Sequence, residues 1–405
     1  MKSNSNCRIC NFPLYDFIDL GEMPISNNFY GNKQNAINAT KFPLKVLYCK
    51  HCLLGQTSVV IPPNVLYENY SYCTGISNGY AMHVRELATL LKEKYSLNEK
   101  SFHVDIAGND GTLLREFKSV LNHEVLNVDP AKTLIEKNIA AGVRHDCNYW
   151  TEKYSHEMVE KYGYADLITA TNVLAHVDDV TGFMLGVEFA LKENGILIIE
   201  VPYISEMVWH NEFDTIYHEH LSYFSITALN ELCIKSGLKI IDVEFFKLHG
   251  GSIRATISRI ESSHRVNDRF HDYIMEEPKF NLFNQKFSEN AEFVKNRLMT
   301  VLLDVSIDNK KVAAFGACAK GNILLNYCGI TDKLVEYIID QTPLKIWKFS
   351  AGTGIPVLPI DEFLKRSPDY ILILAWNFKE EIIEKLKSWG YKGKFIVPIP
   401  EVTII

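Results

Sequence analysis

Residues 102–117 read FHVDIAGNDGTLLREF and join three structural signals in one short segment. A short apolar run ends at Ile106, a turn with two glycines follows, and the residues from Thr112 onward have helical character. A glycine-containing turn between a buried strand and a helix is typical of the first unit of a parallel, doubly wound sheet. We therefore predict a strand over residues 102–106, a turn, and then a helix.

The turn is rich in acids and lacks both a full GxGxxG motif and a phosphate-binding lysine. Carboxylates disfavour a pyrophosphate cofactor and favour a neutral or cationic one. The next apolar run ends at Asp129, where a carboxylate can accept both hydroxyls of a ribose. This pattern favours S-adenosylmethionine (SAM), whose sulfonium and ammonium groups are positive; NAD, or a plain loop with solvated acids, is the alternative. The candidate cofactor-binding residues of the turn are Asp105, Gly108, Asn109 and Asp110.

Strands and helices continue to alternate along the chain. The predicted strands lie at residues 124–129, 167–170, 196–201, 311–316, 334–340, 370–375 and 395–399. Residues 265–305 are charged and helix-periodic, which predicts a connecting helix pair. We expect an α/β protein with a central Rossmann-like domain and a smaller Rossmann-like domain after it. The predicted domains span residues 1–66, 67–264 and 265–405, the last with the helical connector.

Four cysteines form two CxxC pairs near the start of the chain: Cys7, Cys10, Cys49 and Cys52. Two such pairs can close a tetrahedron of thiolates around Zn²⁺ with no open position, as in structural sites. The intervening loop is longer than in common zinc ribbons, and disulfides or chance pairs are the alternatives. Zinc is favoured because no secretory signal is visible. In addition, so small a segment buries too little core to be stable without a bound metal ion.

The composition is that of an ordinary globular protein. Of the 405 residues 47% are hydrophobic and the net charge is −7, which argues against general nucleic-acid binding. No apolar run approaches the roughly 20 residues that cross a bilayer. The remaining cysteines are scattered, as reduced core thiols are. We therefore expect a cytoplasmic protein with neither nucleic acid nor membrane as partner.

Residues 216–224 read IYHEHLSYF and place four ionisable side chains in succession. His218 and His220 flank Glu219, but they do not form HExxH and would not share a helical face. A metal site and a solvated surface run are alternatives; the apolar and aromatic flanks favour general acid–base chemistry. His176 follows the predicted strand at 167–170, at a sheet edge where ligands bind.

Residues 316–322 read GACAKGN and follow another predicted strand. Helix amides together with Lys320 suit a diphosphate. The alternative is a turn whose glycines serve only close packing.

Five segments occur in a familiar order: VDIAGNDGTLL (104–114), ATNVLAHVDDV (170–180), DTIYHEHLSYFS (214–225), LHGGSIR (248–254) and FGACAKGNILLNYCG (315–329). Together with the CxxC pairs, they resemble the sugar C-methyltransferases that act on nucleotide-linked 4-keto-deoxy sugars. The resemblance covers essentially the whole chain. One departure is Ala107, where serine or a similar small polar residue is expected.

The resemblance implies a zinc-binding domain, a SAM-dependent methyltransferase domain and a C-terminal domain that helps to hold the nucleotide sugar. It implies methylation at carbon 3, next to the keto group, with His220 as the base and Glu219 orienting it. Tyr217 and His176 would bind or reprotonate near the keto oxygen, and Tyr72 would reach the site from the start of the middle domain. Whether His220 or Tyr217 takes the proton stays open.

Further candidates are Asn172 for the cofactor, and Lys320, Asn322, His249 and Arg254 for the substrate. We expect a monomer. An O- or N-methyltransferase and a non-catalytic zinc-domain adaptor are the competing functions.

Overall fold

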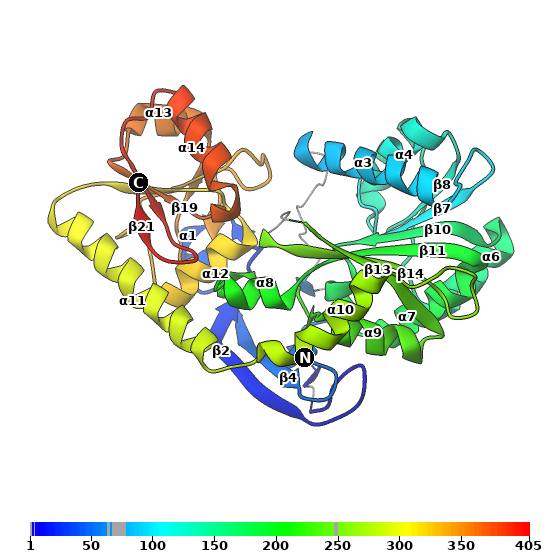
Figure 1. Cartoon of the computed structure of the whole chain (residues 1–405). Helices are drawn as coiled ribbons and strands as arrows, with labels where there is room; N and C mark the ends of the chain where they lie inside the picture. The colour runs from blue at the N-terminus through cyan, green and yellow to red at the C-terminus, as the bar shows by residue number, and fades with distance from the viewer. Residues whose placement is uncertain (1, 4, 63–64, 67–77, 247–249) are drawn as a thin grey trace.

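The computed structural model describes residues 2–3, 5–62, 65–66, 78–246 and 250–405. Two predicted site residues, Tyr72 and His249, lie outside the described residues. The chain builds two α/β units side by side, with the N-terminal segment below and between them (Figure 1). In the part of the chain that is described, no helix is both long and apolar enough to cross a membrane.

The middle unit contains a seven-stranded sheet in the order β13-β14-β11-β10-β7-β8-β9. Its strands are β7 (Phe102–Ile106), β8 (Glu124–Val128), β9 (Arg144–Asp146), β10 (Ala165–Thr171), β11 (Leu191–Pro202), β13 (Leu238–Phe246) and β14 (Ser252–Arg259). Strand β14 runs in the opposite direction to the other six strands. The strand order reverses between β7 and β10, and ligands bind outside the carboxyl ends of strands at such a switch point. The predicted strand over residues 102–106 is confirmed.

Both faces of this sheet are covered. Leu197 and Ile199 pack into one core and Ile196 and Ile198 into the other, so a continuous apolar run satisfies two faces. Helices α3 and α4 lie over one face, and α6, α7, α9 and α10 lie over the opposite face (Figure 1). The helices are α3 (Asn78–Lys94), α4 (Thr112–Leu121), α5 (Ile135–Ala140), α6 (Glu152–Tyr162), α7 (Val180–Ala190), α8 (Ile204–Trp209), α9 (Ile226–Lys235) and α10 (Asp268–Glu276).

The C-terminal unit has a six-stranded sheet, which is parallel except for its last strand. The long helix α11 (Lys286–Ile307) leads into it, and with α10 it confirms the predicted helix pair. The strands are β15 (Val312–Phe315), β16 (Ile338–Ile339), β18 (Val357–Leu358), β19 (Tyr370–Ile373), β20 (Lys394–Val397) and β21 (Thr403–Ile404). The helices are α12 (Ala319–Cys328), α13 (Ile360–Arg366) and α14 (Lys379–Ser388).

The N-terminal segment forms sheets with residues from both other units. Strand β12 (Ser222–Tyr223) of the middle unit completes a four-stranded sheet in the order β12-β5-β4-β2, and β17 (Phe349–Ser350) pairs with β3. The N-terminal elements are β1 (Lys2–Ser3), β2 (Leu14–Pro24), β3 (Phe29–Tyr30), α1 (Lys33–Ile37), β4 (Lys41–Cys49), β5 (Gly55–Thr57) and β6 (Val59–Val60). Short 3₁₀ turns cover Lys132–Leu134, Leu174–His176, Phe213–Thr215, Glu277–Phe280 and Trp376–Phe378.

The hydrophobic residues of this segment divide between two cores. Phe17 and Leu44 pack with the C-terminal unit, whereas Ile9 and Leu54 pack with the middle unit. The segment therefore needs both partners to bury its apolar surface.

Candidate active site

The turn after β7 has an unusual backbone. Ala107, Asn109 and Gly111 adopt φ values of 55°, 49° and 71°, so that alternate residues lie in the left-handed region. Only glycine enters this region freely. The side-chain amides of Asn127 and Asn138 both donate to the Asn109 carbonyl, at 2.9 and 3.0 Å, and hold this conformation.

Gly108 is the point of closest approach in the turn. A Cβ atom at Gly108 would collide with carboxylate and amide oxygens of Asp105 and Asn127. Two of those oxygens, Asp105 Oδ2 and Asn127 Oδ1, are buried without a hydrogen-bond partner among the described residues. These two oxygens lie at the carboxyl edge of the sheet and can accept hydrogen bonds or attract a positive charge. They therefore fit a cofactor that carries positive charge, as SAM does.

Asp105 and Asp129 end the two neighbouring strands. Burial raises the pKa of Asp105 to about 7; the hydroxyl of Thr169, which donates to its Oδ1 at 2.7 Å, opposes this shift, and the negative charge of Asp129 adds to it. The Asp129 carboxylate accepts the backbone N–H groups of Asn109 and Ala131 at 3.0 and 2.8 Å. Asp129 thus ties the two βα turns together, and its predicted bond to a ribose would use the remaining lone pairs.

The Asp110 carboxylate is bound by neighbouring side chains of the protein. Its carboxylate accepts from the Thr112 hydroxyl at 2.7 Å and pairs with Lys137 Nζ at 2.7 Å. These hydrogen bonds hold its pKa below the usual value against the effect of burial. Asp110 therefore organises the start of α4, and its contact with the cofactor stays a prediction.

Tyr217 and His220 form a hydrogen-bonded pair. Tyr217 Oη lies 2.6 Å from His220 Nε2, and His220 Nδ1 lies 3.0 Å from the Thr215 carbonyl oxygen. Because a carbonyl only accepts, Nδ1 carries the hydrogen and Nε2 accepts the phenolic proton. The Thr215 carbonyl accepts the Nδ1 hydrogen, so any orientation of His220 by Glu219 acts through the backbone turn and stays a prediction.

His218 and Glu219, the two residues that precede His220, contact the N-terminal segment. His218 Nε2 lies 3.3 Å from the carbonyl oxygen of Phe42, and burial lowers the pKa of this histidine to about 4. Glu219 is buried and accepts hydrogen bonds from Ser26 and Asn27. The histidines of the HEH sequence therefore diverge, which excludes a metal site shared between them.

His176 lies beside this pair. It ends the 3₁₀ turn after β10, and its ring centre is 5.0 Å from that of His220 in an edge-on arrangement. The Leu221 N–H donates to the Ala175 carbonyl at 2.7 Å and joins the two loops. Burial lowers the pKa of His176 to about 4, so the ring is neutral at pH 7. Asn172, at φ 56°, follows β10 at the same sheet edge.

Three of the predicted substrate-binding side chains contact protein groups. Lys320 pairs with Glu212 at 3.5 Å and lies 4.6 Å above the Trp376 ring. Asn322 is buried and donates to the Ser26 carbonyl at 2.8 Å. Arg254 donates to the buried carboxylate of Glu200 at 2.7 Å.

The glycines of the C-terminal turn have a packing role. A Cβ atom at Gly316 would lie 3.1 Å from that of Ala375, and one at Gly321 would lie 2.6 Å from that of Leu374. Close packing against the two residues that follow β19 therefore accounts for both glycines. The diphosphate contact at this turn stays a prediction.

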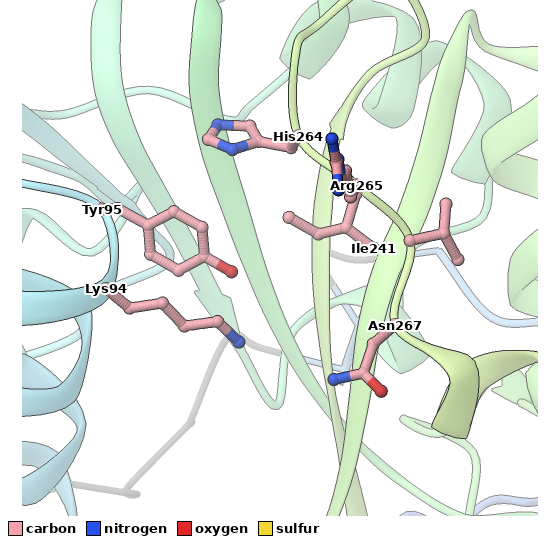
Figure 2. A pocket seen from close by; sticks show the side chains of 7 residues that line it. Lys94, Tyr95, Ile241, His264, Arg265 and Asn267 are labelled. Carbon is pink, nitrogen blue, oxygen red and sulfur yellow. The ribbon is translucent and has the colours of Figure 1, made fainter.

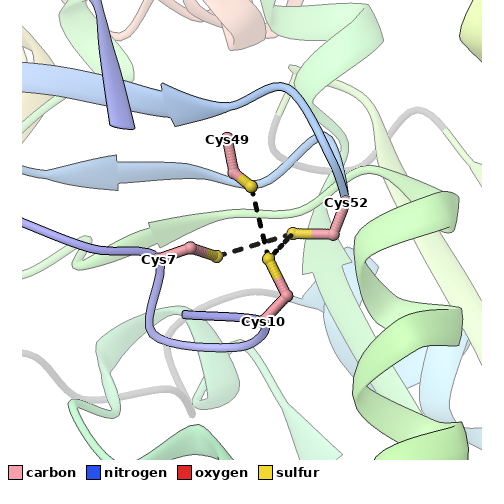
Figure 3. Close-up of side chains that lie close together, drawn as sticks. All are labelled: Cys7, Cys10, Cys49 and Cys52. Atoms are coloured by element: carbon pink, nitrogen blue, oxygen red, sulfur yellow. Dashed lines mark hydrogen bonds between the residues drawn. The ribbon is translucent and has the colours of Figure 1, made fainter. Parts of the chain in front are cut away.

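The four paired cysteines meet in one buried cluster (Figure 3). Their Sγ atoms lie 3.3 to 3.6 Å apart across three pairs, and all four lie within 4.8 Å of one another. Sulfurs about 2.3 Å from a tetrahedral Zn²⁺ are roughly 3.8 Å apart, so the donor set fits zinc. No disulfide bond joins any two of them, which argues against the disulfide alternative. Among the described residues, no other group of three His, Cys, Asp or Glu side chains is close enough to hold a metal ion.

A cavity of about 360 Å³ lies away from these residues (Figure 2). It is bounded by the end of α3 at Lys94 and Tyr95, by Ile241 of β13, and by the loop at residues 264–267. None of the predicted site residues lines it.

Several residues of the site were not predicted. The Thr215 carbonyl is a backbone group, so its role leaves no mark in the sequence. Ser26 and Asn27 lie more than 190 positions from Glu219 along the chain. Only the three-dimensional fold brings them together.

Known families match the chain in three consecutive regions. A zinc binding domain model matches residues 7–67, a methyltransferase domain model matches residues 80–243, and a C-methyltransferase C-terminal domain model matches residues 247–400. C-methyltransferase NovU from Streptomyces niveus is 33% identical over 405 residues, which cover 98% of this chain and 96% of NovU.

Solved structures resemble part of the chain. A SAM-dependent methyltransferase from Clostridium acetobutylicum is 13% identical, covers 44% of this chain and 92% of its own, and gives a TM-score of 0.36. The dimethyltransferase RosA from Streptomyces davawensis is 12% identical, covers 44% of this chain and 55% of its own, and gives a TM-score of 0.35. The match to NovU and the three family models agree along the sequence. This chain therefore belongs to the family of SAM-dependent C-methyltransferases that carry an N-terminal zinc-binding domain.

Proposed function

We propose that this protein methylates carbon 3 of a nucleotide-linked 4-keto-deoxy sugar. The observation that carries the proposal is the Tyr217–His220 pair, with 2.6 Å between Oη and Nε2. Transfer of a methyl group to carbon requires a base, because the carbon must first become a nucleophile. A carbon beside a carbonyl can lose a proton to give an enolate, which makes a keto sugar a suitable substrate.

In the proposed step His220 acts as the base through Tyr217 rather than directly on the substrate: the Tyr217 oxygen takes the proton from carbon 3 while its own proton passes to His220 Nε2. The C–H bond breaks, its electron pair becomes the enolate, and His220 ends as an imidazolium whose Nδ1–H still donates to Thr215. Neutral His176 donates a hydrogen bond to the developing oxyanion. Bound SAM supplies the electrophilic methyl group, which the nucleophilic carbon accepts.

The cofactor is proposed to lie along the turn at Gly108. Asp105 would hold its positive charge, and Asp129 the ribose. Asn172 is at the same edge of the sheet and would face the cofactor from β10. The buried acceptor oxygens of the turn support this arrangement.

Lys320 is proposed to meet the diphosphate of the substrate. It lies at the first turn of α12, and burial raises the pKa of its partner Glu212 to about 7 despite the attraction of Lys320. A protonated Glu212 would release the lysine for an anion at little cost. Arg254 and Asn322 would support the substrate pocket through Glu200 and Ser26.

We also propose that the protein acts as a cytoplasmic monomer with domain boundaries near residues 66 and 264. The described cysteines form no disulfide bond, which supports a reducing compartment. Asn27 contacts Glu219, and Asn322 contacts the adjacent Ser26, so residues of all three parts are linked near the proposed site within one chain and no second copy is needed.

The test uses nucleotide-linked 4-keto sugars deuterated at carbon 3, with mass spectrometry as the readout. We expect SAM-dependent gain of one methyl group with loss of the deuterium. An O- or N-methyltransferase would retain the deuterium. Without SAM, the wild-type protein should exchange the deuterium with solvent, and both Tyr217→Phe and His220→Ala should slow this exchange roughly 100- to 10,000-fold. Exchange at the wild-type rate in both variants would contradict the proposed base.

A further inference from the structure

The Glu219 carboxylate receives its hydrogen bonds from the N-terminal segment. Asn27 Nδ2 donates to Oε1 at 2.9 Å, and Ser26 Oγ donates to Oε2 at 3.4 Å. Glu219 itself is only 1% exposed. Burial raises the pKa of Glu219, and the hydrogen bonds from Asn27 and Ser26, together with one from its own backbone N–H, oppose that shift and fix the carboxylate.

The donors are in turn fixed by the C-terminal unit. Asn322 of α12 donates from Nδ2 to the Ser26 carbonyl at 2.8 Å, and Asn326 donates to Asn322 Oδ1 at 3.0 Å. Asn322 is 3% exposed, so this contact is shielded from water. One chain of hydrogen bonds therefore runs from α12 through Ser26, just after β2, to Glu219.

Glu219 belongs to the same tight turn as the proton-transfer pair. The His220 N–H donates to the Tyr217 carbonyl at 2.9 Å, so that Glu219 lies inside a single turn of backbone. Fixing its side chain therefore limits the movement of the residues on either side. Buried Tyr223 also faces the carboxylate, and burial raises the pKa of this phenol, so that it stays uncharged.

We propose that Ser26 and Asn27 are positioning residues for methyl transfer, which act by holding the Glu219 carboxylate and with it the Tyr217–His220 turn. The zinc-bearing N-terminal segment thus completes the active site rather than only stabilising the fold. This inference rests on the proposed function, because it assigns Tyr217 and His220 to proton transfer.

The first test compares substitutions at Asn27 by steady-state kinetics. Asn27→Ala should lower kcat roughly 10- to 100-fold, with SAM affinity and zinc content unchanged. Asn27→Asp should lower kcat further, because it preserves the shape but puts a second carboxylate against Glu219. A purely structural role predicts the opposite order, since aspartate leaves no cavity. Ser26→Ala should have a smaller effect, because its bond is longer.

Asn28→Ala is the matched control. Asn28 is the next residue in the chain and is likewise half-buried, and its side chain makes no hydrogen bond to any described residue. A similar fall in kcat for Asn28→Ala and Asn27→Ala would overturn the inference. The double variant Asn27→Ala with Glu219→Gln should be no slower than Glu219→Gln alone, because Asn27 acts through that carboxylate. Additive losses would contradict this route.

A second measurement needs no sugar substrate. Carbon-13 NMR of protein with labelled glutamate carboxyl groups, assigned through Glu219→Gln, follows the titration of Glu219. Loss of the Asn27 amide should raise the pKa of Glu219, because that hydrogen bond favours the carboxylate over the acid. An unchanged titration in Asn27→Ala would overturn the contact. If the wild-type protein methylated no keto sugar, the proposed function would fail while this titration still decided the Asn27–Glu219 interaction.

Discussion

Asp105 keeps one buried carboxylate oxygen without a hydrogen-bond partner among the described residues, at the place where a cationic cofactor is expected. Its pKa is raised from 3.8 to about 7, with burial as the largest cause. The acid is therefore half protonated near neutral pH, and only the carboxylate attracts a cation. A positive cofactor would have to displace the proton before it could use this oxygen.

This pKa predicts that SAM binding depends on pH. Above pH 7 the dissociation constant should be constant, and below it the constant should rise about tenfold per pH unit, since one proton is released on binding. Calorimetry in buffers of different ionisation enthalpy measures both the affinity and the proton. Asp105→Asn should bind SAM more weakly at pH 8. Its dissociation constant should not depend on pH, and it should release no proton on binding. A wild-type affinity that is flat from pH 6 to 8 would contradict this assignment.

At the scale of single residues the sequence is informative where the chemistry needs a rare side chain. The paired cysteines were found from their spacing and do meet in one cluster. Tyr217, His220 and His176 were also chosen from the sequence, and the structure brings them together. The hydrogen-bond partner of Glu219 could not be predicted, because Asn27 lies 192 positions away and no local pattern indicates it.

At the scale of elements, the turn between β7 and α4 (Ile106 to Thr112) carries strain. Ala107 has φ 55°, a left-handed conformation that costs a non-glycine residue about 1–2 kcal/mol. At Gly108, the next residue, there is no room for a side chain, because a Cβ atom would collide with oxygen atoms of Asp105 and Asn127. Two adjacent positions of one turn therefore respond to substitution in opposite directions.

We predict that Ala107→Gly stabilises the protein and Gly108→Ala destabilises it. Relief of strain at residue 107, less the larger entropy of glycine in the unfolded chain, should raise the free energy of unfolding by up to about 1 kcal/mol. Gly108→Ala should lower that free energy and weaken SAM binding. Urea unfolding and calorimetry measure the two effects. The same sign of stability change in both variants would show that the left-handed conformation is not maintained in solution.

Strands buried on both faces were the easiest elements to predict. The run at residues 102–106 is a strand over its whole length, because its neighbours on both sides are also strands of the sheet. The run at residues 334–340 looked equally apolar, yet only Ile338–Ile339 pairs with other strands. Val335 and Tyr337 are buried in the core but lie before the assigned strand, so hydrophobicity alone overestimated its length. The sheet partners β12 and β17 could not be predicted, since their pairing depends on contacts distant in sequence.

At the scale of the whole molecule, the zinc cluster is joined to the loop that carries His176. Arg8 lies between Cys7 and Cys10, and its guanidinium donates to the Val177 carbonyl at 3.2 Å and pairs with Asp178 at 3.6 Å. Lys235 of α9 donates to the Ile9 carbonyl at 2.8 Å. The loop between the first two cysteines is therefore fastened to the middle unit on two sides.

The ionisation of the cluster depends on a cation. A hydrogen bond from Cys52 lowers the pKa of Cys7, whereas burial raises that of Cys10. Four thiolates in one buried cluster repel one another unless a metal ion compensates their charge. Removing zinc should therefore release the Cys7–Cys10 loop and with it the contacts of Arg8.

We predict that zinc loss lowers the rate of methyl transfer more than it lowers SAM affinity. Cys10→Ser should lose zinc and stability, and kcat should fall because the His176 loop loses its Arg8 contact. SAM binding should persist, since the cofactor turn leads into α4, whose buried residues Leu113 and Phe117 pack in a separate core. Elemental analysis, kinetics and calorimetry on one preparation measure all three quantities.

Cys147→Ser is the control, because Cys147 is half-buried, lies outside the cluster and contacts the Pro130 carbonyl instead. This variant should keep its zinc and its kcat. Arg8→Met distinguishes the effect of zinc from the effect of the Arg8 contact with the His176 loop. Zinc should stay bound in this variant, while kcat should fall as in Cys10→Ser. If Arg8→Met kept full activity, the zinc cluster would act on catalysis only through global stability, and its link to His176 would be wrong.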